Sequence, residues 1–305
     1  MIKKSLFTAF VLLVAYHFML PHISHRFFEF LGQQRDNYAK AQRYVYDVPI
    51  GTKVIVGSSM SDMLDNEVLG PGYYKLTLAG SSALTCLEIV QRSNKRPTVV
   101  LIEINVLHRD RDKEFLDDLF SPPFYQLRQH FEMFREKGRP ADFVGGLAEA
   151  GVRKVCKYTA RVLYGSGPSI SSAPEGATPA LRTKLLQIER EARDFTPAHE
   201  MLKKRTDQLG DYVDALTRQG VTCILFEMPI DASLSNLTAP NLWRQALNER
   251  FPPAKYHWLN FDHSRNYETR DGVHLIPAEA HRVSQVVVDY VNRVTDQTAG
   301  TTAIR

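Results

Sequence analysis

The sequence predicts an α/β protein in which helices cover both faces of a parallel sheet. Five short apolar segments alternate with segments of helical pattern, and this alternation is typical of parallel strands joined by crossover helices. The first apolar segment, Val54-Ile55-Val56, has no polar break, as expected for a strand covered on both faces. We expect strands at residues 53–56, 73–79, 98–104, 221–226 and about 256–261.

Small and polar residues follow three of these strands. Gly57-Ser58-Ser59 ends the first strand, Gly80-Ser81-Ser82 the second and Glu103-Ile104-Asn105 the third. Ligands of parallel α/β sheets bind outside the carboxyl ends of the strands. The pattern therefore indicates an active site at this edge of the sheet.

Two of the helices that flank the strands can be located in the sequence. Residues 83–90 form a helix after the second strand, and the last helix begins near Pro277, which suits a first helical turn. One face of the last helix is apolar at helical spacing. That face carries Val283, Val286, Val287, Tyr290 and Val291.

A long insertion, residues 111–200, separates the third and fourth strands. Its first part, residues 111–163, has a helical pattern, and residues 164–178 are rich in Gly, Ser and Pro, as in a loop. Residues 179–219 predict two helices separated at Thr196-Pro197. The insertion could be a lid, a partner surface or a solvated decoration.

The N-terminus predicts a membrane anchor or signal at residues 1–21. Lys3 and Lys4 precede an apolar run over residues 6–20, which is short for a full bilayer span. No small-x-small cleavage site follows, so an uncleaved anchor is favoured over a cleaved signal, with the N-terminus inside. We expect residues 22–50 to be a connector and residues 293–305 to be a tail.

The composition argues against several functions. The net charge of +4 comes without a basic stripe, so nucleic acid is not an expected partner. The three cysteines, Cys86, Cys156 and Cys223, show no metal-ligand spacing. We expect neither a metal nor another cofactor.

Ser59 is the candidate nucleophile. A serine on a glycine-containing turn after a strand can expose its hydroxyl at the sheet edge, where backbone N–H groups also point outward. Ser58 and Ser61 are alternatives, and helix capping explains such a serine equally well when it is taken alone.

Asp271 and His274, just before the last helix, are the candidate acid and base. An aspartate three residues ahead of a histidine can bond the imidazole Nδ1–H, which leaves Nε2 free to take a proton from a serine. The alternative without a catalytic role is a polar turn in which Asp271 caps the chain and His274 is exposed to solvent. His108, after the third strand, is the other candidate base.

Serine, glycine, asparagine and Asp-x-x-His in this order resemble the four blocks of the SGNH/GDSL hydrolase superfamily. The resemblance spans about residues 51–292 apart from the insertion, and it implies a three-layer α/β/α, flavodoxin-like fold. It implies Ser59 as nucleophile, His274 as base and Asp271 as its orienting acid. Oxyanion donors would be Ser59 N–H, Gly80 N–H and the Asn105 side chain, with the Ser81 or Ser82 N–H as alternatives to Gly80.

Two blocks depart from the superfamily pattern. Gly57-Ser58-Ser59 stands where the family has Gly-Asp-Ser, and Glu103-Ile104-Asn105 where it has Gly-x-Asn. The pattern assigns no role to Glu103. With Gly-Ser-Ser in place of Gly-Asp-Ser and an N-terminal anchor, the chain is similar to bacterial cell-envelope proteins of teichoic acid D-alanyl transfer or exopolysaccharide O-acetylation.

The resemblance implies a serine esterase or O-acyltransferase that acts on acyl esters of a cell-envelope polysaccharide. The expected location is the periplasmic side of the inner membrane, and a membrane-bound O-acyltransferase is a possible partner. Two alternatives stay open: a non-catalytic accessory subunit of such an acyltransferase, and a lipid esterase.

Overall fold

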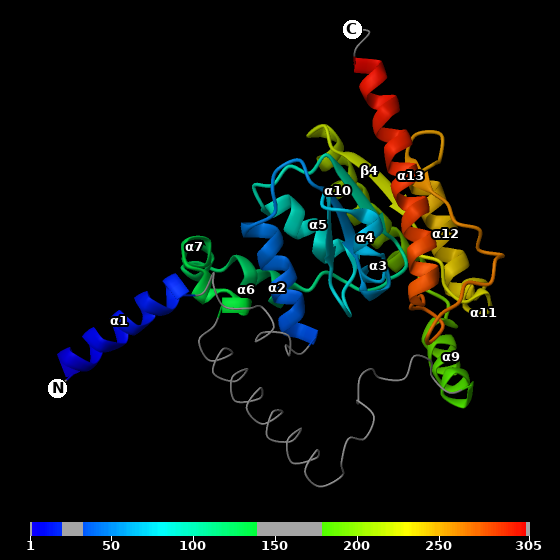
Figure 1. Ribbon diagram of the computed structural model, residues 1–305. Coiled ribbons are helices and arrows are strands. Elements are labelled where there is room, and N and C mark those ends of the chain that lie inside the picture. The colour runs from blue at the N-terminus through cyan, green and yellow to red at the C-terminus, as the bar shows by residue number, and fades with distance from the viewer. Residues whose placement is uncertain (1, 20–32, 139–178, 303–305) are drawn as a thin grey trace. The chain divides into compact units, whose positions relative to one another are not determined.

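The chain divides into two compact units in a computed structural model that describes residues 2–19, 33–138 and 179–302. One unit comprises residues 1–47 and 117–173, and the other comprises residues 48–116 and 174–305 (Figure 1). The second unit contains the sheet and every candidate site residue.

A five-stranded, wholly parallel sheet forms the centre of the second unit, so the chain is an α/β protein as predicted. The strands lie in the order β2-β1-β3-β4-β5, the order of flavodoxin-like sheets. All five predicted strands are confirmed, and only their ends differ. They are β1 (Lys53–Gly57), β2 (Tyr73–Thr77), β3 (Val99–Glu103), β4 (Thr222–Phe226) and β5 (His257–Leu259).

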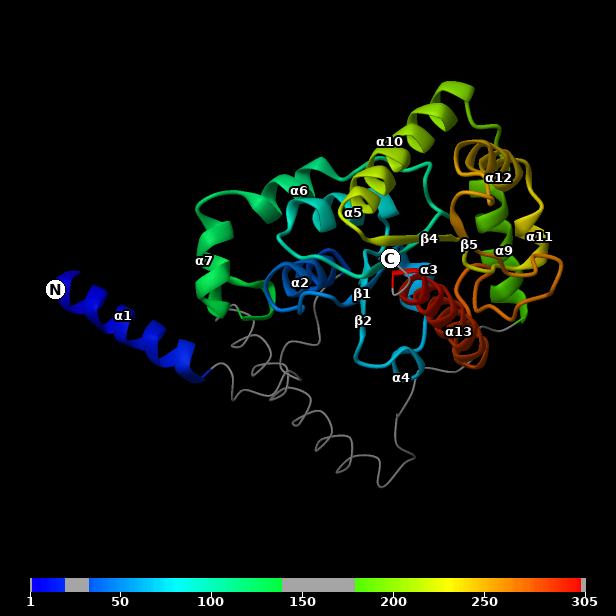
Figure 2. The same cartoon turned by 90° about the horizontal axis from the view of Figure 1, so that it is seen from above.

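Helices cover both faces of this sheet (Figure 2). Because side chains alternate along a strand, Ile55, Leu101 and Ile224 point to one face, where they join a core cluster with residues of α13. The same face holds the short helices α3 (Ser59–Asp62) and α4 (Asn66–Leu69). On the other face lie α5 (Ala83–Arg92) and α10 (His199–Arg218), with α12 (Thr238–Arg250) packed on α10.

The last helix, α13 (Pro277–Thr302), begins at Pro277 as predicted. Val283, Val287 and Val291 are buried, whereas Val286 is 44% exposed, so the apolar face is narrower than the sequence suggested. The helix also continues to residue 302, through most of the residues expected as a tail.

The insertion is divided between the two units. Residues 113–120 form α6 (Lys113–Phe120), and residues 117–138 belong to the first unit, whereas the helices after residue 178 belong to the second. The two helices predicted over residues 179–219 are confirmed as α9 (Pro179–Arg193) and α10. The predicted loop over residues 164–178 lies outside the described residues.

The first unit contains a helix that the sequence did not predict. Within the expected connector, α2 (Gln33–Tyr46) packs on a 3₁₀ turn, η4 (Glu136–Gly138), where Arg35 bonds the buried Glu136 at 3.2 Å. The unit also contains α7 (Phe124–His130) and a second 3₁₀ turn, η3 (Glu132–Phe134).

The N-terminal helix, α1 (Ile2–Met19), exposes large apolar side chains, including those of four consecutive residues, 11–14. Four consecutive residues point to all sides of a helix, so α1 has no polar stripe there. Among the described residues, no helix combines the length and hydropathy needed to cross a membrane. The anchor therefore stays a prediction.

Candidate active site

Ser59 lies at the sharp turn between β1 and α3. Ser58 is the N-cap of α3 in extended conformation, and its Oγ accepts a hydrogen bond from Met60 N–H at 3.2 Å. Such capping fixes the first helical turn, because the first N–H groups of a helix have no partners within it. Ser59 is thereby held as the first residue of α3.

The carboxylate of Glu103, at the end of β3, lies beneath this turn. Its Oε2 accepts from Ser58 N–H at 2.8 Å and Ser61 N–H at 3.1 Å, and its Oε1 accepts from Ser58 Oγ–H at 2.7 Å. The glutamate is only 2% exposed. A Cβ at Gly57 would lie 2.4 Å from Glu103 Oε2, so the glycine of the motif makes room for this carboxylate.

The far end of α3 is tied to the neighbouring strand. Lys75 Nζ donates to the carbonyls of Asp62 and Leu64 at 2.8 and 2.7 Å, and Thr77 Oγ1 donates to Asp62 Oδ1 at 2.7 Å. Both ends of the four-residue helix are therefore anchored to strands, which restricts movement of Ser59.

Asp271 and His274 lie in a closed loop before α13. A bridge between Thr269 and Leu275 closes the loop, and Asp271 Oδ1 accepts from the Val273 and His274 N–H groups at 3.1 and 2.9 Å. Gly272 has φ of +102°, and a Cβ there would lie 2.7 Å from Leu186. The positive φ therefore favours glycine at this position, and a Cβ would also displace the end of the Leu186 side chain.

The structure brings Ser59, His274 and Asp271 into one hydrogen-bonded chain. His274 Nε2 lies 2.9 Å from Ser59 Oγ, and His274 Nδ1 lies 2.6 Å from Asp271 Oδ2. Both distances are within the reach expected of a nucleophile, a base and the group that orients the base. The side chains of Asp271 and His274 are 25% and 27% exposed, so a ligand can reach this hydrogen-bonded set of side chains.

The pKa shifts of His274 and Asp271 agree with this geometry. The hydrogen bond to Asp271 raises the pKa of His274 above its usual value despite partial burial, and the charges of Asp271, Glu189 and Glu103 add to the rise. Burial alone would raise the pKa of Asp271, but the hydrogen bonds and charge of His274 outweigh it and lower that pKa to about 2. Asp271 is thus ionised over the physiological range, where it stabilises a positive charge on His274.

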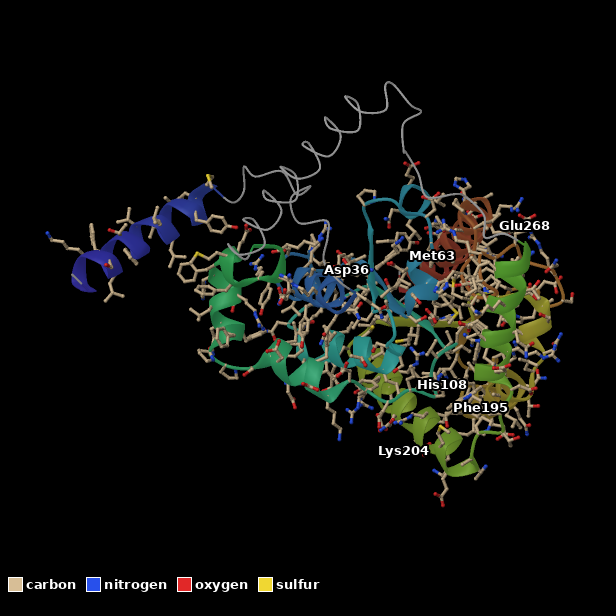
Figure 3. All side chains as sticks on the ribbon, turned by 90° about the horizontal axis from the view of Figure 1, so that it is seen from below. Asp36, Met63, His108, Phe195, Lys204 and Glu268 are labelled. Carbon is tan, nitrogen blue, oxygen red and sulfur yellow. The ribbon has the colours of Figure 1, made fainter. Side chains whose placement is uncertain are left out.

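The alternative residues have other partners. Ser58 Oγ is bonded to Glu103, and Ser61 Oγ donates to the Ser58 carbonyl at 3.2 Å. His108 lies against Phe195, with ring centroids 6.3 Å apart, and the two are adjacent in Figure 3. Of the serines considered, only Ser59 bonds a histidine.

The Ser59 N–H is available as an oxyanion donor. The next three N–H groups of α3 are bonded to Ser58 Oγ, Glu103 and the Ser58 carbonyl, and within the described part of the chain no such bond uses the Ser59 N–H. Gly80, which has φ of +78°, is exposed after β2. The Ser81 N–H, an alternative to it, already bonds the Leu78 carbonyl at 3.1 Å.

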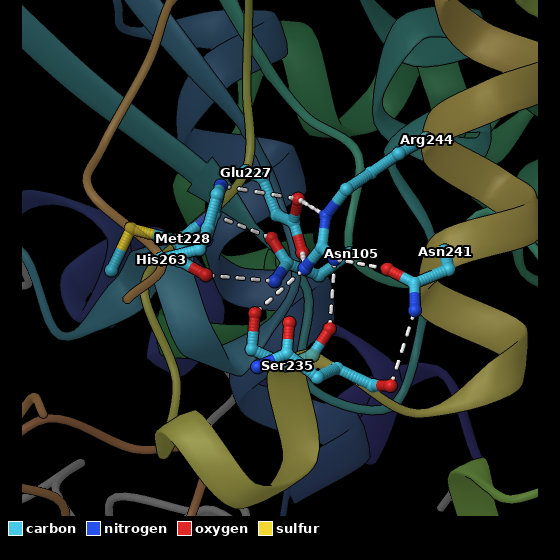
Figure 4. Close-up of polar contacts among 8 residues, drawn as sticks. Asn105, Glu227, Met228, Ser235, Asn241, Arg244 and His263 are labelled. Carbon is cyan, nitrogen blue, oxygen red and sulfur yellow. Dashed lines mark hydrogen bonds and ion pairs between the residues drawn. The ribbon is translucent and has the colours of Figure 1, made fainter. Parts of the chain in front are cut away.

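Asn105 is fixed by the main chain of Met228, two residues after the end of β4. Its Nδ2 donates to the Met228 carbonyl at 2.9 Å, and its Oδ1 accepts from Met228 N–H at 2.7 Å (Figure 4). An amide group has two N–H bonds, so one of them remains for another acceptor. Asn105 is therefore oriented, with a donor to spare, at the sheet edge where Ser59 lies.

The sequence did not predict that α9 contributes to this site. Leu186 packs toward Gly272, and the charge of Glu189 acts on His274, so α9 runs past the loop that carries Asp271 and His274. The helix itself was predicted within residues 179–219, but its partner loop lies over 80 residues further along the chain and no local signal joins them.

In the described ranges, no group of three or more His, Cys, Asp and Glu side chains is placed to hold a metal ion. The chain matches no model of a known protein family. Its sequence also matches none of the curated proteins with which it was compared.

Proposed function

We propose that the protein is a serine esterase or O-acyltransferase of SGNH/GDSL type. The observation that carries this proposal is the unbroken chain from Ser59 Oγ through the His274 ring to the Asp271 carboxylate, with steps of 2.9 and 2.6 Å. A serine hydroxyl becomes a useful nucleophile when an oriented base can take its proton, and this chain supplies both base and orientation.

The reaction would proceed in two acyl-transfer steps. Ser59 Oγ attacks the acyl carbonyl while His274 Nε2 takes its proton, and the Ser59 and Gly80 N–H groups and the Asn105 amide donate to the oxyanion. His274 then protonates the leaving alcohol, and an acyl-Ser59 ester remains. Water or a sugar hydroxyl, deprotonated by His274, attacks this ester and releases Ser59.

Glu103 would act as a positioning residue. It touches no substrate in this scheme, but it holds the N–H groups of Ser58 and Ser61, which flank the nucleophile. These bonds use the N–H groups of Ser58 and Ser61, whereas the Ser59 N–H has no partner in the described part of the chain and stays available to an oxyanion.

The substrate we propose is an acyl ester of a cell-envelope polysaccharide. This part rests on the similarity of Gly57-Ser58-Ser59, together with the predicted N-terminal anchor, to cell-envelope members of the superfamily. A membrane-bound O-acyltransferase would be the natural partner if the acyl group is transferred rather than released to water.

We also propose that α1 associates with a membrane and that the sheet-containing unit lies on the periplasmic side. The exposed apolar side chains of α1 support this, because water disfavours such a surface. Its 18 residues span about 27 Å, slightly less than the roughly 30 Å hydrocarbon core.

Hydrolysis of p-nitrophenyl esters by the full-length protein in detergent tests the activity. We expect turnover of the acetyl ester that Ser59→Ala abolishes and Ser61→Ala retains. A steep preference for acyl chains longer than acetyl would instead favour a lipid esterase, and a rate equal in wild type and Ser59→Ala would contradict the proposal.

A further inference from the structure

The C-terminal end of α1 is attached to the rest of the first unit. Tyr16 Oη donates to the Gly138 carbonyl of η4 at 3.1 Å, and α1 also packs on η3. Tyr16 is half-buried, whereas the side chains of residues 11–14 are exposed. Figures 1 and 2 both show this end of α1 next to α7. The unit therefore holds α1 at one end and leaves most of its length exposed.

This attachment determines where a membrane would meet the first unit. The apolar side chains of residues 11–14 point to all sides of α1, which suits immersion in hydrocarbon, whereas a helix that lies on a lipid surface needs a polar face. Tyr16 lies less than one helical turn before the end of α1 at Met19. A bilayer that surrounds α1 would therefore have its boundary close to η3 and η4.

Two phenylalanine rings are exposed near this boundary. Phe124, at the start of α7, and Phe131, at its C-terminal cap, are 51% and 42% exposed. Outside α1, no other large apolar side chain in the described part of the first unit is as exposed. The exposed apolar surface of this unit is thus confined to α1 and to the segment that ends at η3.

The Phe131 ring also connects α7 to the turn on which α1 packs. It contacts Phe134 of η3 edge-on, with ring centroids 6.2 Å apart. We call Phe124, Phe131 and Phe134 the aromatic patch. Because η3 contacts α1, the apolar surface continues from α1 through η3 to α7.

The charges around the aromatic patch do not favour a strongly charged partner. Arg128 is buried, and Arg135 is paired with Asp47 at 2.7 Å. The exposed charged residues of η3 and η4 are Glu132 and Lys137, which have opposite signs. A lipid surface would therefore be held here by apolar contact rather than by attraction to anionic headgroups.

We propose that the aromatic patch inserts into the interface of the membrane that holds α1, so that the first unit rests on the lipid surface at the C-terminal end of this helix. Aromatic and other large apolar side chains are favoured at that depth. The inference rests on the proposed association of α1 with a membrane. It adds a second membrane contact, made by α7 and η3.

Site-specific fluorescence of the full-length chain in lipid vesicles tests this contact. Cys86 and Cys223 are buried, so a Cys156→Ser background restricts labelling to an introduced cysteine. Phe131→Cys carries the environment-sensitive dye NBD as the reporter of the aromatic patch. Phe124→Cys is a second reporter, in case Phe131→Cys does not fold.

Two further positions are controls. Gln126 is exposed on α7 two residues after Phe124, so it points to the opposite side of the helix. Leu12→Cys, near the middle of α1, reports the association of α1 itself. The vesicles contain phosphatidylethanolamine and phosphatidylglycerol, with bromine either high on the acyl chains or near their ends, because bromine quenches a fluorophore that it contacts.

We expect the label of Phe131→Cys to emit at a shorter wavelength than that of Gln126→Cys and to lose intensity when bromine lies high on the acyl chains. The label of Leu12→Cys should lose intensity when bromine lies near the chain ends. Replacing phosphatidylglycerol with phosphatidylcholine should leave the Phe131→Cys signal unchanged, because the contact is apolar.

Quenching of Leu12→Cys without quenching of Phe131→Cys or Phe124→Cys would overturn the inference and leave the proposed association of α1 standing. Quenching at none of these positions would contradict both. Equal quenching at Gln126→Cys and Phe131→Cys would also overturn the inference, since the patch would then have no preferred side toward the lipid. These signals do not depend on ester hydrolysis, so they are independent of the test of the candidate active site.

Discussion

Glu103 Oε2 accepts from the backbone N–H of Ser58 at 2.8 Å, and its Oε1 accepts from the hydroxyl of the same residue at 2.7 Å. One buried carboxylate thus holds both the main chain and the side chain of the residue that precedes the candidate nucleophile. A carboxylate that accepts several hydrogen bonds in a buried place is hard to replace, because each donor left without a partner costs free energy.

Glu103→Gln should therefore impair catalysis more than binding. The amide has only one acceptor oxygen for three donors, so the turn that carries Ser59 should loosen. We expect kcat to fall about 10- to 100-fold with KM little changed, and the free energy of unfolding to fall by about 1–3 kcal/mol. Steady-state kinetics and urea unfolding measure the two effects.

Glu88→Gln is the matched control. Glu88, like Glu103, accepts several hydrogen bonds. Its donors are the Arg111 guanidinium and the Tyr212 hydroxyl, and neither belongs to the candidate site. Glu88→Gln should lower the free energy of unfolding and leave kcat unchanged. Equal losses of kcat in the two variants would mean that Glu103 acts only through stability.

The pH profile should report His274. Its neutral form is the base, and Asp271 raises its pKa, so kcat/KM should rise with pH through an apparent pKa above 6.5, the usual histidine value. Asp271→Asn removes the negative charge, so this limb should move to lower pH while the plateau falls by about 10³- to 10⁴-fold. A limb that stays in place in Asp271→Asn would contradict the assigned pair.

Much of this site could be predicted from the sequence because its parts carry local signals. Apolar strands followed by small polar residues placed Ser59 and Asn105 at one sheet edge, and the short Asp-x-x-His spacing joined Asp271 to His274. The role of Glu103 could not be predicted, since its partners lie more than 40 residues earlier in the chain. The available signal was a single acidic residue at the end of an otherwise apolar strand, Val99–Glu103.

The helix α2 was missed for a different reason. Its sequence, QQRDNYAKAQRYVY, is mostly polar, so it lacks the broad apolar stripe by which an amphipathic helix is recognised. Its buried positions include Ala39, Ala41 and Gln42, and Gln42 Oε1 accepts from Glu136 N–H at 2.7 Å. Tyr44 and Val45 are the larger apolar side chains buried in α2, and two adjacent residues near the end of the helix do not make a helical repeat.

Gly272→Ala should displace the loop that carries Asp271 and His274. The substitution forces alanine to φ of +102° and brings its Cβ to 2.7 Å from Leu186 and 2.9 Å from Leu234. We expect a loss of about 1–3 kcal/mol in the free energy of unfolding and a fall in kcat, because Asp271 and His274 move with the loop.

Gly220→Ala separates backbone strain from steric clash. Gly220 has φ of +80°, and nothing lies within 4 Å of the position of its Cβ. This variant should lose about 1 kcal/mol and keep wild-type kcat. If Gly272→Ala behaves in the same way, the contact with Leu186 does not fix the loop.

Asn105→Ala and Asn105→Asp should both lose activity. Asn105→Asp retains an acceptor for Met228 N–H, but it loses both the N–H that bonds the Met228 carbonyl and the N–H proposed for the oxyanion. We expect kcat to fall by about 10²- to 10³-fold in each variant, as for other lost oxyanion donors. Wild-type kcat in Asn105→Asp would show that this side chain has only a structural role.

Labelling by a fluorophosphonate probe, followed by mass mapping of the modified peptide, tests the central claim most directly. A serine activated by a neighbouring base reacts with this probe, whereas an ordinary surface serine does not. We expect the label on Ser59, retained in His108→Ala and abolished in His274→Ala. Label on Ser58 or Ser61, or no label on the folded full-length protein, would contradict the Ser59–His274–Asp271 assignment.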